Sequence, residues 1–459
     1  MGAACCGGAG AINSEAPIYI SLPVTAFQFA PYLTAVVVAP ILLVLLSLYP
    51  LLVVLSPVSE PPQASEVNYA SPSSDRLQPL PSLRDEASVQ LSVVIPAFNE
   101  SSRLPKMLDE AITYLEQLRN RSLPLNQAAS PSKQDQAVGV SSFEKDDQRG
   151  PPTLDALDGP LKTFEVIIVD DGSTDDTSKV ALEYADSRRS EGGSEIRVVR
   201  LAKNKGKGAA VRHGVLHCRG SLILFADADG ATRFSDIAAL CREMKRILTP
   251  SGHGIAVGSR AHLVSTEAVV KRSFIRNFLM HSFHIFLSLL LRPPVPLSHV
   301  SRIIRPFLGS NVPDGAKVES LSKQPLIRDT QCGFKLFTRE SARSIFPLSH
   351  IDRWIFDVEL LLLAEMASEA ASASVWSIRN GSCSADSDRA GQEGSRRPSL
   401  KDPLLDLPLP IAEVPVHWEE IGGSKIDLVK DSVGMALDLL IIRANYALGR
   451  WKKPAPVRL

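Results

Sequence analysis

The sequence predicts an α/β protein built on a mostly parallel sheet with helices on both faces. Short apolar stretches of β-compatible residues recur along the chain, and each ends at a polar or glycine-containing turn. Helix-like stretches separate them, so that strand and helix alternate four times between residues 91 and 225. The apolar stretches lack the polar alternation of strands that face water on one side. This indicates strands buried on both faces and joined by right-handed crossovers.

The individual elements follow from apolar spacing and from the residues that begin or end them. After the strand LSVVIP, leucines and other apolar residues recur at helical spacing from Leu104 to Leu118. After the strand FEVIIV, Gly172 makes a turn, and Ser, Thr and Asp residues cap the next helix. Strands are expected at 91–96, 164–169, 196–201, 222–225, 254–257 and 411–417, and helices at 104–118, 176–185, 211–217, 234–248, 354–366 and 428–448.

Composition divides the chain into an apolar N-terminal part, a globular domain and polar insertions. Stretches rich in Pro, Ser, Gln or Asp without apolar periodicity are typical of linkers or disordered insertions. We expect a tail (1–31), a transmembrane anchor (32–56), a linker (57–88), the main domain (89–366) with insertions at 120–159 and 293–325, a further insertion (369–405), and a C-terminal strand and amphipathic helix that complete the domain (411–459).

The apolar run at residues 32–55 is about long enough to cross a bilayer and carries no charge. A cleaved signal peptide is disfavoured, because the run is too long and no Lys or Arg precedes it. The first basic residues, Arg76 and Arg84, follow the run, which predicts a lumenal N-terminus and a cytosolic remainder. Pro40 and Pro50 leave a membrane hairpin as the alternative to a single span.

Two further apolar stretches leave alternatives open. Residues 274–291 are interrupted by Arg276 and two histidines, which favours an interfacial or groove-lining helix over a second span. The apolar side of the last expected helix fits either the membrane surface or, as we favour, the core, and it comprises Val433, Leu437, Leu440 and Ile441.

Charge and cysteine usage exclude some classes of protein. Fifty basic and 50 acidic residues give a formal net charge of zero, so the chain lacks the basic field of nucleic-acid binders, and no nucleic-acid partner is expected. The six cysteines are scattered without zinc spacing or a disulfide framework, which fits a reducing compartment for most of the chain.

The sequence element with the clearest chemistry is Asp227-Ala228-Asp229, which ends the strand LILF. Two carboxylates one residue apart at the end of a strand point the same way and repel each other unless a cation lies between them. Mg²⁺ or Mn²⁺ suits such a pair, since these ions prefer carboxylate and phosphate oxygens. The alternative is a loop with two solvated aspartates.

Polar clusters follow four of the expected strands, at what should be one edge of the sheet. The lysine–glycine turn would let backbone N–H groups and ammonium groups approach a diphosphate, and the acidic residues could hold a base, a ribose or a metal. Neither a P-loop nor a dinucleotide fingerprint is present, and each lysine taken alone is more simply a solvated charge. Together the clusters predict a nucleotide-diphosphate site with a metal-assisted leaving group; they are Asn99/Glu100, Asp170/Asp171, Lys203/Lys205/Lys207 and Asp227/Asp229.

Six motifs resemble those of the family 2 glycosyltransferases with the GT-A fold, and more narrowly those of the dolichyl-phosphate β-glucosyltransferases. They are VVIPAFNE, VIIVDDGSTDDT, NKGKGAAVRHG, FADADGAT, VGSR and DTQCGFK. The resemblance implies UDP-glucose as donor, dolichyl phosphate as acceptor, and a dolichyl β-glucosyl phosphate made with inversion. It also implies that Pro96, Ala97 and Glu100 line the nucleotide, and that Asp170 or Asp171 contacts uracil or ribose.

The resemblance assigns charged residues to the reaction itself. Asp227 and Asp229 would hold the metal against the diphosphate, and Arg260 would ligate the phosphates. Arg272 or Arg276 would bind the acceptor phosphate. That phosphate is already an anion, so it needs no strong base to attack the sugar.

Some positions depart from the family pattern or allow two roles. Mannose synthases carry a Gln where this chain has Ala231, which leaves the metal's third protein ligand open. Asp357 or Glu359 occupies the region of the catalytic base in sugar-accepting relatives; we assign Asp357 to sugar or loop positioning, with a helix-surface acid as the alternative. Gly333 should permit a close backbone approach, and Lys335 should reach a phosphate unless this loop is purely structural.

The sequence thus predicts a single-pass glucosyltransferase of the endoplasmic reticulum membrane with its catalytic domain in the cytosol. The alternatives are another polyprenyl-phosphate glycosyltransferase, such as a mannosyltransferase, and an inactive nucleotide-sugar-binding scaffold. An intact D-x-D together with Arg260 argues against the scaffold.

Overall fold

In the computed structural model, two units are distinguished, Met1–Ser56 and Pro57–Leu459. The structure describes residues 47, 49–57, 62–63, 65–72, 74–121, 161–188, 194–265, 327–379, 409–422 and 428–455. In the first unit, residues 49–55 are helical. Among all these residues, no helix combines the length and the apolar character needed to cross a membrane. Most of the predicted anchor, 32–56, lies outside the described residues.

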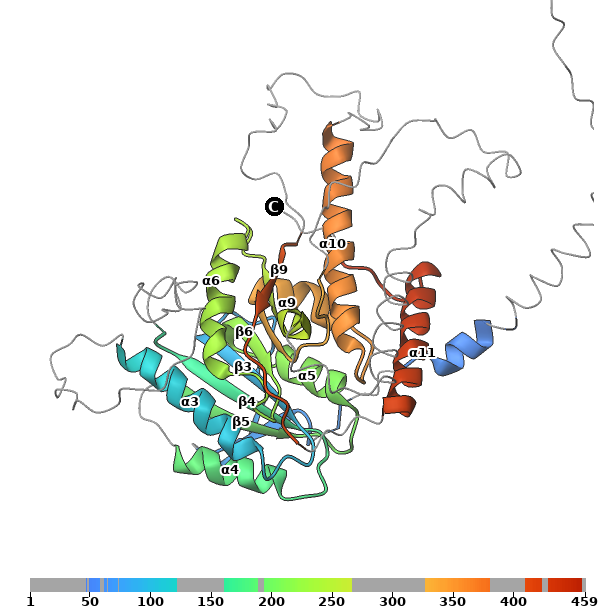
Figure 1. The fold of residues 1–459 in the computed structure, drawn as a ribbon. Coiled ribbons are helices and arrows are strands. Elements are labelled where there is room, and N and C mark those ends of the chain that lie inside the picture. Colours follow the sequence, from blue (N-terminus) through green and yellow to red (C-terminus); the bar gives the residue numbers. More distant parts are fainter. Residues whose placement is uncertain are drawn as a thin grey trace, which may run out of the picture. The chain divides into compact units, whose positions relative to one another are not determined.

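The second unit is organised around one sheet, whose nine described strands run in the order β2-β1-β5-β4-β3-β6-β8-β7-β9 (Figure 1). The middle strands β5, β4, β3 and β6 are mutually parallel, while β8 and β1 run antiparallel to their neighbours. The strands are β1 (Asn68–Ser71), β2 (Ser74–Pro79), β3 (Val89–Ala97), β4 (Phe164–Asp170), β5 (Ser194–Arg200), β6 (Gly220–Ala226), β7 (Ile255–Ser259), β8 (Phe334–Thr338) and β9 (Ile411–Pro415).

The chain reverses its direction across the sheet between β3 and β6. From β3 it moves outward through α3 (Leu104–Arg121) to β4, and through α4 (Thr177–Ser187) to β5. It then crosses back through α5 (Lys207–Leu216) to β6, on the other side of β3. Such a reversal leaves a crevice at the carboxyl ends of the two strands, where open α/β sheets bind ligands.

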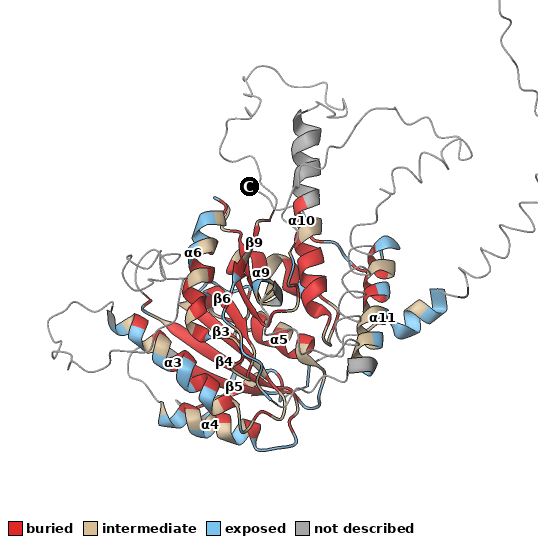
Figure 2. Ribbon diagram, in the orientation of Figure 1, coloured by how far each residue is buried: buried red, intermediate tan, exposed pale blue. Residues whose placement is uncertain are grey.

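Helices cover both faces of the sheet, and the strands between them are buried (Figure 2). One face packs against α3, α4 and α6 (Ile237–Ile247), with side chains such as Val93 and Leu108 in a common core. On the other face, the glycine surface of α5 approaches Val94, and Phe356 of α10 (Phe356–Arg379) contacts Phe225. All residues of β4 are buried, which confirms the prediction of strands without a solvent face.

Other elements join or extend the sheet. α9 (Arg339–Ile345) follows β8 and packs on β6, and α11 (Leu428–Ala447) is the last helix. Short 3₁₀ turns are η3 (Phe234–Asp236), η4 (Ala261–Ser265) and η6 (Phe346–Leu348).

The structure corrects three expectations. The linker expected at 57–88 contains β1 and β2, which extend the sheet at one edge. Residues 334–338, where no strand was expected, form the antiparallel strand β8. The core was favoured for the apolar side of α11, but only Ile441 is buried there, whereas Val433, Leu437 and Leu440 are exposed.

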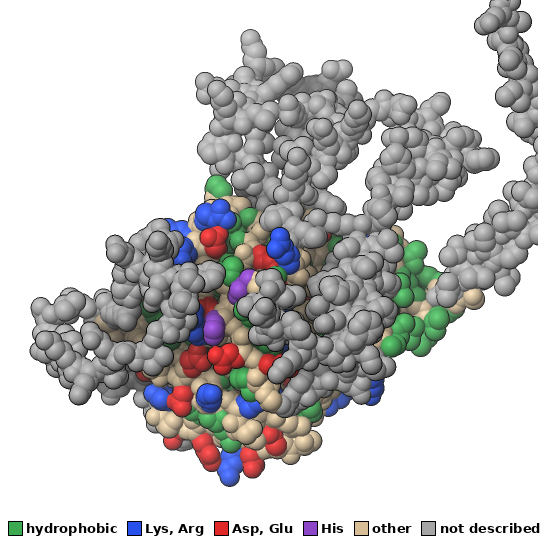
Figure 3. All heavy atoms as spheres, in the orientation of Figure 1, with side chains coloured by type: hydrophobic (Ala, Val, Ile, Leu, Met, Phe, Trp, Pro, Cys, Tyr) green, Lys and Arg blue, Asp and Glu red, His purple; other side chains and the backbone are tan. Residues whose placement is uncertain are grey.

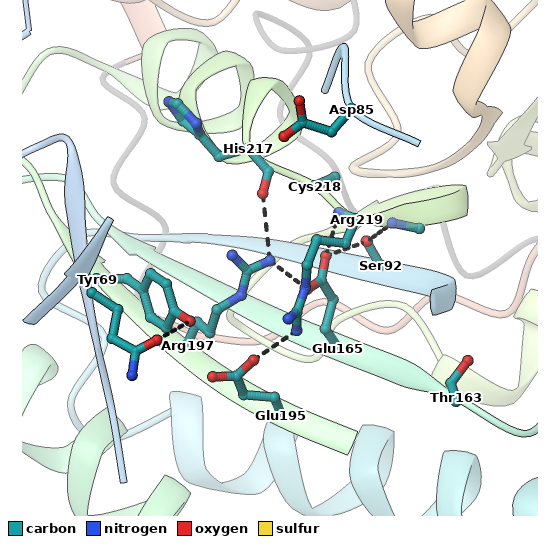
Figure 4. Close-up of polar contacts among 12 residues, drawn as sticks. Tyr69, Asp85, Ser92, Thr163, Glu165, Glu195, Arg197, His217, Cys218 and Arg219 are labelled. Atoms are coloured by element: carbon teal, nitrogen blue, oxygen red, sulfur yellow. Dashed lines mark hydrogen bonds and ion pairs between the residues drawn. The ribbon is translucent and has the colours of Figure 1, made fainter. Parts of the chain in front are cut away.

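A buried polar network holds the starting ends of the parallel strands together (Figure 4). The Glu165 carboxylate accepts hydrogen bonds from Ser92 Oγ at 2.5 Å and from Arg219 N and Nε at 2.7 Å each. Arg197 Nη2 bonds the same carboxylate, and neither side chain of this ion pair is exposed. Buried charges must be paired. Because these charges are paired with one another, acidic and basic residues can occupy otherwise apolar strands.

Candidate active site

The turns that follow β3 and β4 interlock at the carboxyl edge of the sheet. Asn99 has a positive φ of 52°, and its Oδ1 accepts a hydrogen bond from Thr174 N at 2.8 Å. Its own N–H donates to Ser173 Oγ at 2.9 Å. Pro96 and Ala97 end β3 beside Val169 and Asp170 of β4. The predicted nucleotide-lining segment therefore has a fixed backbone conformation.

Asp170 and Asp171 both make internal hydrogen bonds. Asp170 is buried and accepts from Ser173 N at 2.8 Å. Asp171 accepts from the backbone N–H groups of Lys205 at 2.7 Å and Gly206 at 2.8 Å. Burial, assisted by the negative charges of Asp170 and Asp352, raises the pKa of Asp171 to about 6. These contacts hold the lysine–glycine turn, while a contact of either aspartate with uracil or ribose stays a prediction.

The three lysines of this turn have different environments. Lys203 is exposed. Lys205 Nζ lies 2.8 Å from Glu66 Oε2, whereas Lys207 Nζ lies 2.5 Å from Asp227 Oδ1. Of the three ammonium groups, that of Lys207 is paired with the acidic D-x-D motif and that of Lys205 with a residue of the expected linker.

The D-x-D motif is held by Gly333, directly before β8, and by its own turn. Asp227 N donates to Gly333 O at 3.1 Å, and Asp229 Oδ1 accepts from Ala231 N at 3.0 Å. Burial and the neighbouring charge of Asp227 raise the pKa of Asp229, against weaker opposing contributions from nearby cations. The site therefore disfavours two charged carboxylates unless positive charge is added.

Two arginines lie close to these carboxylates. Arg103 binds both oxygens of Glu100, at 2.7 and 2.5 Å; this hydrogen bonding and the charges of Asp229 and Asp227 raise the Arg103 pKa, against the opposing effect of burial. Arg260 binds both oxygens of Asp329, at 2.7 and 2.9 Å. Burial alone would lower the Arg260 pKa, but the Asp329 contacts and the charge of Asp227 raise it overall.

Lys335 and Asp357 form a buried ion pair close to Lys207 and Asp227. Lys335 Nζ lies 2.6 Å from Asp357 Oδ1 and also donates to Cys332 O at 2.6 Å. The residues are 1% and 2% exposed. Burial raises the pKa of Asp357, and Lys335 and Lys207 oppose this shift. Lys335 is thus buried in an ion pair, and its contact with a phosphate stays a prediction. The alternative of Asp357 as a helix-surface acid is wrong, because the residue is buried.

Comparison with known proteins identifies the family. The model described as glycosyl transferase family 2 matches residues 151–275. A dolichyl-phosphate β-glucosyltransferase of Dictyostelium discoideum is 36% identical over 80% of this chain and 77% of its own length. The chain belongs to the dolichyl-phosphate β-glucosyltransferase family. The Homo sapiens protein of the same name is 35% identical over 81% of each chain, and membership makes this chain a glycosyltransferase.

A solved structure with a distant likeness is glucosyl-3-phosphoglycerate synthase from Mycobacterium tuberculosis in complex with uridine diphosphate. It is 15% identical, covers 78% of this chain and 80% of its own, and has a TM-score of 0.35. A likeness this weak carries no argument about which ligands this chain binds.

The side chains that could ligate a metal in this family member suit an ion that a substrate also coordinates. Among the described residues, no three His, Cys, Asp or Glu side chains are grouped as metal ligands. Within the described ranges, Asp227 and Asp229 are the pair that could hold such an ion, and Mg²⁺-type sites with few protein ligands are commonly completed by phosphates and water. For the open question of a third protein ligand, the described part of the chain offers no His, Cys, Asp or Glu grouped with this pair.

The structure brings several of the predicted site residues together. Glu100, Lys207, Asp227, Asp229 and Arg260 belong to one network of charges at the crevice. Arg272, Arg276 and the apolar stretch 274–291 lie outside the described residues.

Sequence reasoning missed four residues of this region. Arg103 could have been found, because it follows Glu100 by three residues, a spacing at which helical side chains pair. Asp329 opens the motif DTQCGFK but was given no role. Glu66 and Trp418 were given none either. Trp418 stacks on Arg260, with the guanidinium carbon 5.5 Å from the ring centre.

Proposed function

We propose that this chain transfers glucose from UDP-glucose to dolichyl phosphate with inversion, giving dolichyl β-D-glucosyl phosphate for protein N-glycosylation. One observation carries the proposal: the acidic pair Asp227/Asp229 follows β6 at the reversal between β3 and β6, next to Lys207 and coupled to Arg103 and Arg260. The names of the relatives supply the sugar and the acceptor.

The charge arrangement supports a diphosphate at this crevice. The Lys207 side chain is 18% exposed and that of Arg260 33% exposed, so neither is closed off from solvent. Preorganised cations stabilise the charge that develops on a departing diphosphate more effectively than water does, because they need no reorganisation. These residues would therefore bind the donor and favour loss of UDP.

Asp227 and Asp229 would hold Mg²⁺ or Mn²⁺. The raised pKa of Asp229 fits this role, since a bound cation relieves the repulsion between the two carboxylates. When bound, the ion would neutralise charge on the diphosphate. Holding the ion and shaping the pocket around it would be the contribution of the protein.

The acceptor needs positioning more than activation. One phosphate oxygen of dolichyl phosphate forms a bond to the anomeric carbon while the bond from that carbon to the UDP oxygen breaks, and UDP leaves with the electron pair. This single in-line displacement inverts the sugar. The Asp357 carboxylate is paired with Lys335. This pairing suits a role in positioning the sugar better than a role in proton transfer.

We further propose an endoplasmic reticulum membrane location, with an anchor at 32–56 and a cytosolic catalytic domain. The apolar N-terminal sequence and the basic residues after it support this orientation. An exposed apolar stripe on and just beyond α11, formed by Val433, Leu437, Leu440 and Leu448, supports contact with a lipid surface. Elsewhere on the second unit, acidic and basic side chains are interspersed over the described surface (Figure 3).

The test is a membrane assay with dolichyl phosphate, Mg²⁺ or Mn²⁺ and labelled UDP-glucose, beside GDP-mannose and UDP-N-acetylglucosamine. Glucosyl lipid formed from UDP-glucose alone and abolished by EDTA is the expected result. Transfer from another donor would replace the proposed sugar but keep the reaction. No transfer by folded protein from any donor would favour an inactive nucleotide-sugar-binding scaffold.

A further inference from the structure

The segment between the predicted anchor and the main domain is part of the sheet. β1 pairs with the edge of β5 through Ala70 and Val198, and β2 pairs with β1. Tyr69 of β1 is 6% exposed, and its ring lies over the buried Arg197 guanidinium, 5.0 Å from ring centre to carbon (Figure 4). This packing fixes the position of the residues just before β1 relative to the end of β5.

Glu66, two residues before β1, reaches from this segment into the lysine–glycine turn. Glu66 is fully buried. Oε1 accepts a hydrogen bond from Ala202 N at 3.1 Å, and Oε2 accepts from Lys205 Nζ at 2.8 Å and from Gln63 N at 2.9 Å. Burial alone would raise the pKa of Glu66, but these donors lower it overall, so the fold stabilises the carboxylate.

The opposite side of the same turn is held by the main domain. Asp171 accepts from Lys205 N and Gly206 N, and Gly206 has a φ of 106° with space for no side chain beside Asp352 O. Lys207, whose ammonium pairs with Asp227, follows directly. A shift of the turn would therefore move Lys207 relative to the acidic pair.

We propose that Glu66 is a positioning residue for the donor diphosphate, which it serves by fixing the Ala202–Lys205 turn from the segment that follows the anchor. The inference rests on the proposed function, because it assumes that this turn faces a nucleotide diphosphate. Lys205 acts as the counter-charge of Glu66, and Lys207 is the lysine that meets the substrate.

The experiment uses the full-length chain in detergent or nanodiscs, with UDP binding measured by calorimetry in the presence of Mn²⁺ and with initial rates. Glu66→Gln keeps the shape and an acceptor for Ala202 N but loses the ion pair with Lys205. Lys205→Met removes the same ion pair from the other side, and the double variant tests their coupling. Glu86→Gln, an exposed carboxylate of the same segment, is the matched control.

We expect Glu66→Gln to raise the Kd of UDP and the KM of UDP-glucose by about three- to tenfold, with kcat and the KM of dolichyl phosphate close to those of the parent. The double variant should bind UDP no more weakly than the weaker single variant. Glu86→Gln should match the parent in all readouts.

Unchanged UDP binding in Glu66→Gln, while the parent binds UDP, would overturn this inference alone. So would an equal change in kcat and in the KM of dolichyl phosphate in both single variants, which would mark a general disturbance of the fold. Failure of the parent to bind UDP would overturn the proposed function and this inference with it.

Discussion

Gly333 lies directly against the Asp227 carboxylate. A Cβ at position 333 would stand 2.5 Å from Asp227 Oδ1 and closer still to Oδ2, while the carbonyl of Gly333 accepts from Asp227 N at 3.1 Å. This confirms the expectation of a close backbone approach at Gly333. The absence of a side chain at Gly333, directly before β8, is thus what lets Asp227 sit at the end of β6.

Gly333→Ala should therefore displace Asp227 and lower kcat/KM by about 100-fold, because small misplacements of a reacting group have effects of that order. We expect a modest cost in unfolding free energy, about 1 kcal/mol, since a side chain rather than backbone must move. Gly434→Ala is the control, because a Cβ at that position of α11 meets nothing within 4 Å. Equal kinetics for the two variants would contradict the argument.

Asp229→Asn should abolish activity without destabilising the fold. The raised pKa of Asp229 means that its charge is disfavoured in the folded state, so a neutral isostere relieves repulsion with Asp227. We expect kcat/KM to fall by about 100-fold or more, an unchanged or higher Tm, and a loss of Mn²⁺ binding by electron paramagnetic resonance. The control is Asp186→Asn on the exposed side of α4. Full activity of Asp229→Asn would rule out the metal role.

The sequence was sufficient to predict the parallel middle of the sheet. Strands such as FEVIIV are buried on both faces and read as continuous apolar runs, and their ends carry the polar clusters. Asp227 and Asp229 were predictable for the same reason, since a polar pair that interrupts a buried strand must lie at its carboxyl end.

Elements that depend on distant partners could not be predicted. β8 contains Lys335, whose burial depends on Asp357, 22 residues further along the chain. β1 is short and lies in a Pro- and Ser-rich stretch with the composition of a linker. Its place in the sheet becomes evident only through the contacts of Arg197 and Glu66. Long-range ion pairs leave no periodicity in the sequence, so charged residues in strands read as loops.

The buried pair Lys335–Asp357 allows a separation of structural and catalytic roles. Asp357→Asn or Lys335→Met alone should lower the unfolding free energy by about 3 kcal/mol or more, because each leaves one buried charge without its partner. The double variant Lys335→Met/Asp357→Leu should recover most of this loss, as apolar replacements of buried ion pairs often do.

We expect the recovered double variant to keep kcat within about tenfold of the parent, because Asp357 would position the sugar and transfer no proton. Chemical denaturation and initial rates measured on the same preparations test this. A stable double variant without activity would show instead that the Asp357 carboxylate itself takes part in the reaction.

The exposed apolar stripe on α11 should affect the KM of the lipid substrate alone. Leu437→Ser/Leu440→Ser removes two side chains that are 46% and 47% exposed, so we expect little change in Tm. If they contact the bilayer, the KM for dolichyl phosphate in vesicles should rise by about tenfold, equivalent to roughly 1.4 kcal/mol of lost apolar contact. The KM for UDP-glucose should not change. Leu248→Ser, 45% exposed after α6, is the control, and equal effects of both variants would contradict membrane contact.

Asp171 should make stability fall as the pH rises through its titration range. Its pKa is about 6 in the folded chain and 3.8 as a free group, so between these values the folded state binds more protons than the unfolded state. The stabilising contribution of the protonated form is therefore present below about pH 4 and lost by about pH 6.

In Asp171→Asn this dependence disappears, although one hydrogen bond to the lysine–glycine turn is weakened. The stability of the parent relative to the variant should thus decrease by about 2 kcal/mol between pH 4.5 and pH 7, as each pKa unit is worth about 1.4 kcal/mol. Chemical denaturation of both proteins at the two pH values measures this difference, with Asp186→Asn as the control for removal of an exposed carboxylate. A difference that stays constant or grows with pH would show that Asp171 is charged in the fold throughout this range, held so by the N–H groups of Lys205 and Gly206.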